Sequence, residues 1–196
     1  MTSGTRAQQR DTTRQTLVDE ARRLFAGRGY GEVGLSAVVE AAGVTKGALY
    51  HHFDGKAQLF RAVLAQVQAE VGDAVEVAAA SRTDAWGQLV EGCGAFLVAA
   101  TDAEVRQIML VDGPAVLGWE GWRALDEANS ARHLHDVLTA LVEDGTIAQQ
   151  PVEPLTHLLS GAMNEAALWV AGTGRGADLD ASRAALLRLL EGLRAR

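Results

Sequence analysis

Proline is absent from the first 113 residues of this 196-residue chain, and its three prolines stand at positions 114, 151 and 154. Proline interrupts helices because it lacks the backbone N–H and its ring clashes with the preceding turn, so its absence permits long continuous helices. Apolar residues recur at helical spacing, and no stretch alternates with the period of two that is typical of strands. We therefore predict an all-α fold.

Glycines and polar residues divide this pattern into successive helices. In the first, Thr12 and Gln15 form a potential capping box, and Gly27 and Gly29 are expected to end it. A long helix is expected to begin near Lys56 and to join two parts of the molecule. The other predicted helices cover residues 12–26, 35–42, 46–53, 84–100, 103–111, 121–143, 151–171 and 179–193.

The most informative stretch is 35–56, in which two short predicted helices flank Gly43-Val44. This arrangement is typical of a helix-turn-helix, whose second helix enters the major groove with its N-terminal end against the base edges. Leu49 and Phe53 are spaced four residues apart and are expected to anchor that helix in the core. The side chains left on its outward face are Thr45, Lys46, Gly47, Tyr50 and His51.

The segment resembles the DNA-binding head of the TetR family of transcriptional regulators. The matching runs are Gly29-Tyr30, Ala42-Gly43-Val44-Thr45, Leu49-Tyr50-His51-His52-Phe53 and Lys56, in the family's order and spacing. The resemblance implies a three-helix DNA-binding head at residues 1–56 and a helical body for effector binding and dimerisation at residues 57–196. It further implies that Tyr50, His52 and Lys56 contact phosphates and that Thr45, Lys46 and Gly47 lie nearest the bases, with His51 able to reach either.

Some features of the head leave alternatives open. Lys46 either donates to a guanine edge or contacts a phosphate. Val33-Gly34 stands where the family usually has two hydroxyl residues, so Ser36 is the predicted source of a hydroxyl for the phosphate backbone. The three arginines near the N-terminus form either a basic arm on the DNA or a solvated tail, namely Arg6, Arg10 and Arg14.

The charge distribution favours DNA contact at one end of the molecule only. Residues 1–56 contain eight Lys or Arg and six Asp or Glu, which makes them net positive, although the whole chain has a net charge of −7. The remaining residues are therefore strongly acidic. A mildly basic head on an acidic body suits a protein that meets nucleic acid with its N-terminal part.

The last two predicted helices are apolar around most of their circumference, which requires burial on two sides. By resemblance, they form a four-helix bundle with the same helices of a second copy, and burial inside one monomer is the alternative. A dimer would bind a near-palindromic double-stranded operator. The residues that make the last helix apolar are Leu186, Leu187, Leu189, Leu190 and Leu193.

The body is expected to bind a largely apolar small-molecule effector. Asn164 lies in an apolar helix with His157 on the same face, and a buried amide needs a partner from protein, water or ligand. Tryptophans and a phenylalanine supply apolar surface, although ordinary core packing explains such residues equally well. The candidate ligand contacts are Trp86, Phe96, Trp119, Trp122, His157, Asn164 and Trp169.

Other classes of function find little support in the sequence. The single cysteine, Cys93, lies among apolar residues and is read as a small buried hydrophobe. The N-terminus is polar and no run of 18 apolar residues occurs, so we expect a cytoplasmic protein without a membrane partner. No catalytic set, metal site or cofactor motif can be placed. We therefore predict a ligand-responsive repressor, with an effector-independent DNA-binding regulator as the alternative and an all-helical enzyme as a remote third.

Overall fold

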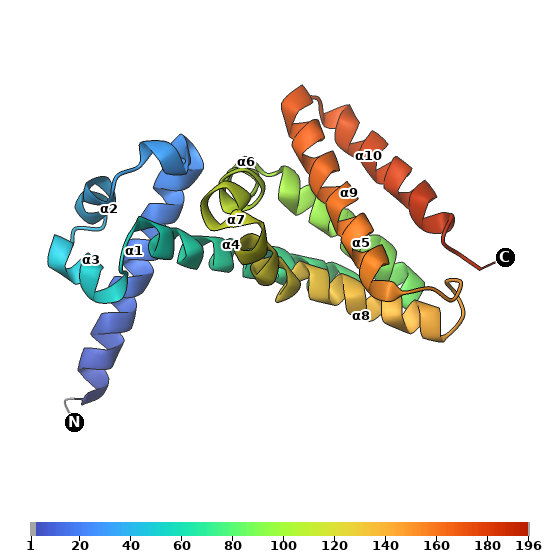
Figure 1. Ribbon diagram of the computed structural model, residues 1–196, viewed down its shortest axis with the longest axis horizontal. Helices are drawn as coiled ribbons and strands as arrows, with labels where there is room; N and C mark the ends of the chain where they lie inside the picture. Colours follow the sequence, from blue (N-terminus) through green and yellow to red (C-terminus); the bar gives the residue numbers. More distant parts are fainter. Residues whose placement is uncertain (1–2, 196) are drawn as a thin grey trace.

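The computed structural model describes residues 3–195, which fold into helices joined by short connections (Figure 1). Within these residues there is no strand, only an isolated bridge between Ile147 and Arg194. The predicted all-α class is confirmed. A head made of α1 (Ser3–Glu32), α2 (Leu35–Ala41) and α3 (Lys46–His52) lies at one end, and α4 (Lys56–Ala79) runs from it into the body.

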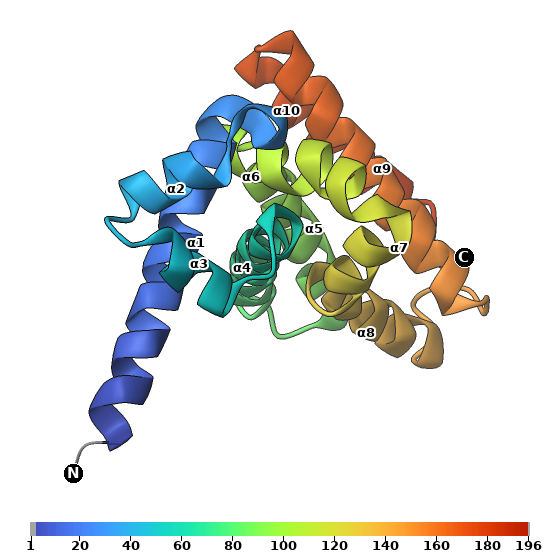
Figure 2. The same ribbon diagram turned by 60° about the vertical axis from the view of Figure 1, so that its left-hand side comes forward.

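Helix α1 is longer than the sequence predicted. The proposed capping box is wrong, because Thr12 lies inside the helix, where its Oγ1 donates to the Gln8 carbonyl at 2.9 Å. Gly27 does not end the helix either. The chain departs from helical geometry only at Gly29, whose φ of 77° bends it toward α2. The N-terminal half of α1 therefore projects past α2 and α3 (Figure 2).

The first turns of α4 share the apolar core of the head. The rings of Phe25 and Tyr30 meet Phe60 of α4 at centroid distances of 5.4 and 5.2 Å, in tilted edge-to-face arrangements that aromatic pairs prefer. Further along α4, Val63, Leu64 and other apolar residues are buried against the body. One continuous helix thus packs on both parts, and the proposed division between residues 56 and 57 falls at its N-terminus.

The body continues with α5 (Ala85–Thr101), the single turn α6 (Ala103–Val105) and a π-helical segment η1 (Arg106–Asp112). The Asp84 carboxylate caps α5 by accepting from the Gly87 N–H at 2.7 Å, as Asp does at helix starts. Helix α7 (Gly113–Glu127) follows directly and is kinked at Gly118, whose φ is 69°. A Cβ at Gly113 would lie 2.8 Å from the Trp122 ring beyond this kink, so only glycine fits at the start of α7.

The predicted helix 121–143 is in fact two helices, α7 and α8 (Ser130–Glu143). The break falls at Asn129, whose backbone is non-helical and whose side-chain amide donates to the Leu125 carbonyl at 2.7 Å. This junction packs on Gly72 of α4, where an added Cβ would lie 3.4 Å from the Asn129 Cβ. Tertiary packing rather than a local breaker therefore separates α7 from α8.

Helices α9 (Val152–Thr173) and α10 (Gly176–Glu191) form one outer side of the body (Figure 1). Each buries one face, with Leu159 and Met163 of α9 and Leu186 and Leu190 of α10 in the core. Their outer faces leave large apolar side chains uncovered. These are Leu158 at 72% exposure, Trp169 at 50%, Leu187 at 42% and Leu189 at 60%.

Among residues 3–195, the structure contains no helix with the length and apolar character needed to cross a membrane.

Candidate DNA-binding head and effector cavity

Helix α3 is held by its apolar side and exposes the opposite one. Leu49 and Phe53 are buried, as the four-residue spacing predicted. The Thr45 hydroxyl caps the helix by accepting from the Ala48 N–H at 3.1 Å. The turn before it requires Gly43, whose φ of 62° is rarely adopted by other residues. The motif therefore fixes α3 rigidly, with its N-terminal end facing outward.

Most side chains predicted to contact DNA are free to do so. The exposed ones are Ser36, Thr45, Lys46, Gly47, Tyr50 and His51. His52 and Lys56 are half-buried. The Lys56 ammonium lies 3.9 Å from the centroid of the Tyr30 ring, which fixes its position through a cation–π contact. Hydroxyl, imidazole and ammonium groups thus surround one exposed helix, a suitable set of phosphate and base donors.

The N-terminal part of α1 brings positive charge to the same surface. The Arg14 guanidinium lies 5.3 Å from the centroid of the Phe53 ring, beside the end of α3. Burial, followed by the nearby charges of His51, Arg10 and Arg14, lowers the pKa of His52. This shift favours the neutral imidazole, a form that still donates one N–H. Arg10 and Arg14 belong to a helix beside α3 rather than to a free tail. The structure does not describe the side chain of Arg6.

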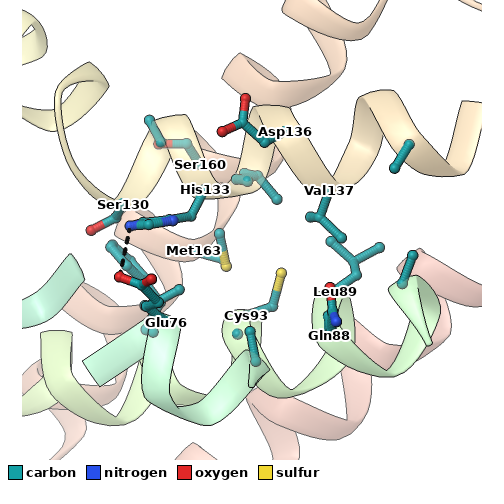
Figure 3. Close-up of a pocket in the computed structure, with 18 of the residues that line it drawn as sticks. Glu76, Gln88, Leu89, Cys93, Ser130, His133, Asp136, Val137, Ser160 and Met163 are labelled. Carbon is teal, nitrogen blue, oxygen red and sulfur yellow. Dashed lines mark ion pairs between the residues drawn. The ribbon is translucent and has the colours of Figure 1, made fainter. Parts of the chain in front are cut away.

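The body contains a cavity of about 410 Å³ between α4, α5, α8 and α9, with the end of α7 closing one side. Figure 3 shows the sulfur atoms of Cys93 and Met163 in its middle. Burial raises the pKa of the Cys93 thiol to about 12, so this group stays a neutral, small apolar contact, as the sequence indicated. Its other apolar walls include Val75, Leu89, Phe96, Leu134 and Val137.

Polar groups on the cavity wall are few and mostly oxygen acceptors. Glu76 and His133 face each other at one end, with 4.0 Å between the Glu76 Oε2 and His133 Nε2 atoms (Figure 3). Leu89, Gln88 and Val137 lie toward the opposite end. The other polar lining residues are Asp126, Ser130, Asp136 and Ser160.

A buried ion pair borders the cavity beside α9. The Arg123 Nη1 donates to Asp126 Oδ2 at 3.0 Å and to Ser160 Oγ at 3.1 Å, and its Nη2 lies 2.5 Å from His157 Nδ1. Because a guanidinium only donates, His157 accepts through Nδ1. Burial raises the pKa of Asp126, against the opposing effects of Arg123 and Ser160. Asp126 and Ser160 face the cavity, whereas Arg123 and His157 line a separate outer groove.

Both the head and the body of the chain resemble known proteins. Residues 17–63 match the family model described as bacterial regulatory proteins, tetR family, and residues 86–193 match the tetracyclin repressor-like C-terminal domain. The Tn10 TetC protein of Escherichia coli is 28% identical over 150 residues, which are 76% of each chain. The crystal structure of a TetR-family regulator from Pectobacterium atrosepticum superimposes with a TM-score of 0.78 and 31% identity, over 96% of this chain and 97% of that one.

The chain belongs to the TetR family of transcriptional regulators. The predicted family resemblance is confirmed. The fold is also shared with FadR of Bacillus subtilis, which was crystallised in complex with stearoyl-CoA, at a TM-score of 0.74 and 18% identity over 90% of this chain and 96% of that one. At that identity the likeness extends to the fold alone.

The regulator's cavity includes only one of the seven side chains proposed from the sequence as ligand contacts, Phe96. Trp119 and Trp169 are exposed, and Trp122 is buried with its indole N–H donating to the Met109 carbonyl at 2.7 Å. The other three also lie outside the lining: Trp86 stacks with Arg194, His157 binds Arg123, and Asn164 is half-buried on α9.

The residues that do line the cavity carried little signal in the sequence. Its walls are mainly aliphatic and small side chains whose spacing is that of any buried helix face. Asp126 stands three residues after Arg123, a spacing equally common for an exposed ion pair. Residue type pointed instead to the tryptophans, which lie outside the cavity lining. Helix packing, which brings α4, α5 and α8 together, defines this site.

The regulator's head is fastened to its body by polar contacts away from the cavity. Arg22 of α1 donates to Glu70 of α4 at 2.6 Å and to Glu104 of α6 at 2.5 Å. These contacts, the Glu70 hydrogen bond above all, raise the pKa of Arg22. The Tyr30 N–H also donates to Asp112 of η1 at 2.8 Å. Movement of α4 or η1 would therefore shift the position of the head.

Proposed function

We propose that this regulator is a repressor that binds a near-palindromic operator as a homodimer and releases it when a small, largely apolar molecule enters the cavity. One observation carries the proposal: α4 lines the cavity with Val75 and Glu76 and also packs against the head through Phe60. A ligand shifts such an equilibrium only by its different affinities for two states, and this helix gives it a direct way to do so. As a DNA-binding regulator without a catalytic role, the protein would work in the cytoplasm.

The DNA contacts of this proposal come from α3 and its surroundings. Tyr50, His52 and Lys56 are assigned to phosphates, together with Ser36 at the start of α2. Thr45, Lys46 and Gly47 at the exposed start of α3 are assigned to the base edges. Support comes from the exposure of this helix end and from the arginines of α1 beside it. Phosphate contacts supply affinity and orientation, whereas base contacts supply selectivity.

Replacing Lys46 by Ala should weaken binding to the preferred operator by about 1–3 kcal/mol and relax its sequence preference at one position. The operator is first obtained by selecting bound sequences from random duplexes, and affinity is then measured by fluorescence anisotropy at fixed salt. Arg28→Ala is the matched control, because it removes one exposed cation of the head away from α3. An unchanged sequence preference in the Lys46 variant would assign this side chain to the backbone instead.

The dimer of this proposal uses the outer faces of α9 and α10. Leu158, Trp169 and Leu189 are largely exposed there, although isolated proteins seldom leave several large apolar side chains together in water. A symmetric pairing of these faces would bury them. It would also place two heads at a fixed separation, as a near-palindromic operator requires.

The cavity supports the effector part of the proposal. Its volume and mainly apolar lining suit a small organic molecule. FadR of Bacillus subtilis, which shares the fold, was crystallised with stearoyl-CoA. A regulator controlled only by its own concentration would not require such a cavity, so ligand control explains the cavity better.

Filling the cavity separates effector response from DNA binding. Val137 points into the cavity (Figure 3), and Val137→Trp should leave operator affinity within about twofold while abolishing release by a compound that acts on the unchanged protein. Val77→Trp is the control, because Val77 is 74% exposed on α4 and does not line the cavity. Such compounds are found by screening for operator release. Full release from the Val137 variant would place the effector site elsewhere.

A further inference from the structure

The charges around the cavity carry information about the chemistry of the effector. Of the residues that line it, Glu76, Asp126 and Asp136 are acidic, and none is Lys or Arg. The one lining side chain able to take a positive charge is His133, which faces the Glu76 carboxylate. Its charge, when present, is therefore paired within the lining itself.

The Arg123 guanidinium, which is bound to two lining residues, does not reverse this balance. Arg123 lies behind the wall, in the outer groove, and its Nη1 is bound to Asp126 Oδ2 and Ser160. It offsets the charge of Asp126 but not that of Glu76, which faces the His133 imidazole. Asp136 lies 3.7 Å from His135 Nδ1, and its side chain is 69% exposed. Both hydrogen bonds to the Asp126 carboxylate within the described chain go to Oδ2, so Oδ1 keeps its capacity to accept.

Charge and apolar surface also occupy different ends of the cavity. Glu76, His133 and Ser130 gather at one end, whereas Leu89, Val137 and the uncharged Gln88 lie at the other, with Cys93 and Met163 between them (Figure 3). Such a lining matches a molecule with one polar end and an apolar body. Because the polar lining consists mainly of carboxylate and hydroxyl oxygens, that polar end must bring hydrogen-bond donors.

We propose that the effector is an amphipathic organic cation, with a protonated amine held beside the Glu76 carboxylate at the polar end of the cavity and an apolar ring or chain lying against Leu89, Val137 and Met163. This rests on the effector-controlled function proposed above and specifies its ligand. A carboxylate or phosphate ligand of similar shape would meet repulsion from the same groups, so the cavity is unsuited to an acyl-CoA of the kind found in FadR.

Three probes that share one apolar body test the proposal by calorimetry on the full-length protein: phenylbutylamine, phenylbutanol and phenylbutyric acid at neutral pH. The ammonium should bind at least about tenfold more tightly than the carboxylate, with the alcohol between them. A partly exposed acidic side chain contributes modestly to each affinity, but it attracts the ammonium and repels the carboxylate, so the two effects add in the ratio of affinities. Equal affinity, tighter binding of the carboxylate, or no binding of the amine would overturn the proposal.

Substitutions in the cavity test which side chain causes the preference for the amine over the carboxylate. Glu76→Gln should bring the ratio of amine to carboxylate affinity toward unity while leaving alcohol affinity within about twofold. Asp73→Asn is the matched control, since this exposed acid lies on the same helix, outside the cavity, and its replacement removes an equal charge. A ratio that changes equally in both variants would show a general charge effect and overturn the assignment to the cavity.

Operator release, followed in parallel by anisotropy, distinguishes failure of this proposal from failure of the proposed function. Release by the alcohol or the carboxylate, but not the amine, would leave ligand control intact and overturn the cationic assignment. Tight amine binding with no release at saturation would support the charge preference and contradict ligand control. Release by the amine, weakened by Glu76→Gln but not by Asp73→Asn, is the result expected from both proposals.

Discussion

Replacing Asp126 by Ala is expected to lower the free energy of unfolding by about 3–5 kcal/mol, because it removes the buried carboxylate partner of Arg123 and leaves this guanidinium only the longer contact with the exposed Glu127, 3.4 Å from its Nε. Asp126 is 4% and Arg123 7% exposed, so water cannot replace the lost contact. Urea denaturation followed by circular dichroism measures the change. The protein concentration must be equal in all samples, because dimerisation contributes to apparent stability.

Two further variants show whether the loss comes from an unpaired buried charge. Glu20→Ala removes a carboxylate from an ion pair of the same three-residue spacing, with Arg23, that is exposed to solvent, and should cost less than about 1 kcal/mol. Replacing Arg123 by Met and Asp126 by Leu together should recover much of the stability. If Asp126→Ala were as mild as Glu20→Ala, the ion pair would not be isolated from water as the structure shows.

The helix-turn-helix was predictable because its determinants are local. Leu49 and Phe53 lie one helical turn apart, Thr45 caps the helix they belong to, and Gly43 supplies the one left-handed residue of the turn. Each of these signals involves residues close in sequence and a single physical rule. The same holds for Asp84, which begins α5 where the pattern placed a helix start.

The cavity and the break between α7 and α8 depend on contacts between distant residues. No glycine or proline near Asn129 marks the end of a helix, and this junction packs on Gly72 of α4. The cavity is likewise a space between helices. In the sequence, its lining residues have the same pattern as an ordinary buried core. Residue type alone therefore selected exposed or structurally bonded side chains such as Trp119 and Trp122.

Leu158→Glu should convert the regulator to a monomer and reduce operator affinity about 100-fold or more, because a dimer gains from binding both half-sites at once. Leu158 is 72% exposed and belongs to the outer apolar face of α9, so a carboxylate there disturbs little in one protomer. At the center of a paired interface it would be buried without a partner, which is costly. Sedimentation velocity at micromolar concentration measures the change in assembly.

Val77→Glu provides the control, since Val77 is 74% exposed on α4 and lies on neither α9 nor α10. This variant should remain dimeric and bind the operator normally, which excludes an effect of added negative charge on its own. The Leu158 variant should keep its helical circular dichroism, because its side chain contributes nothing to the buried core. A Leu158→Glu protein that stays dimeric and holds its operator would show that this regulator assembles through a different surface, and the placement of the two heads would then have to be derived from that surface.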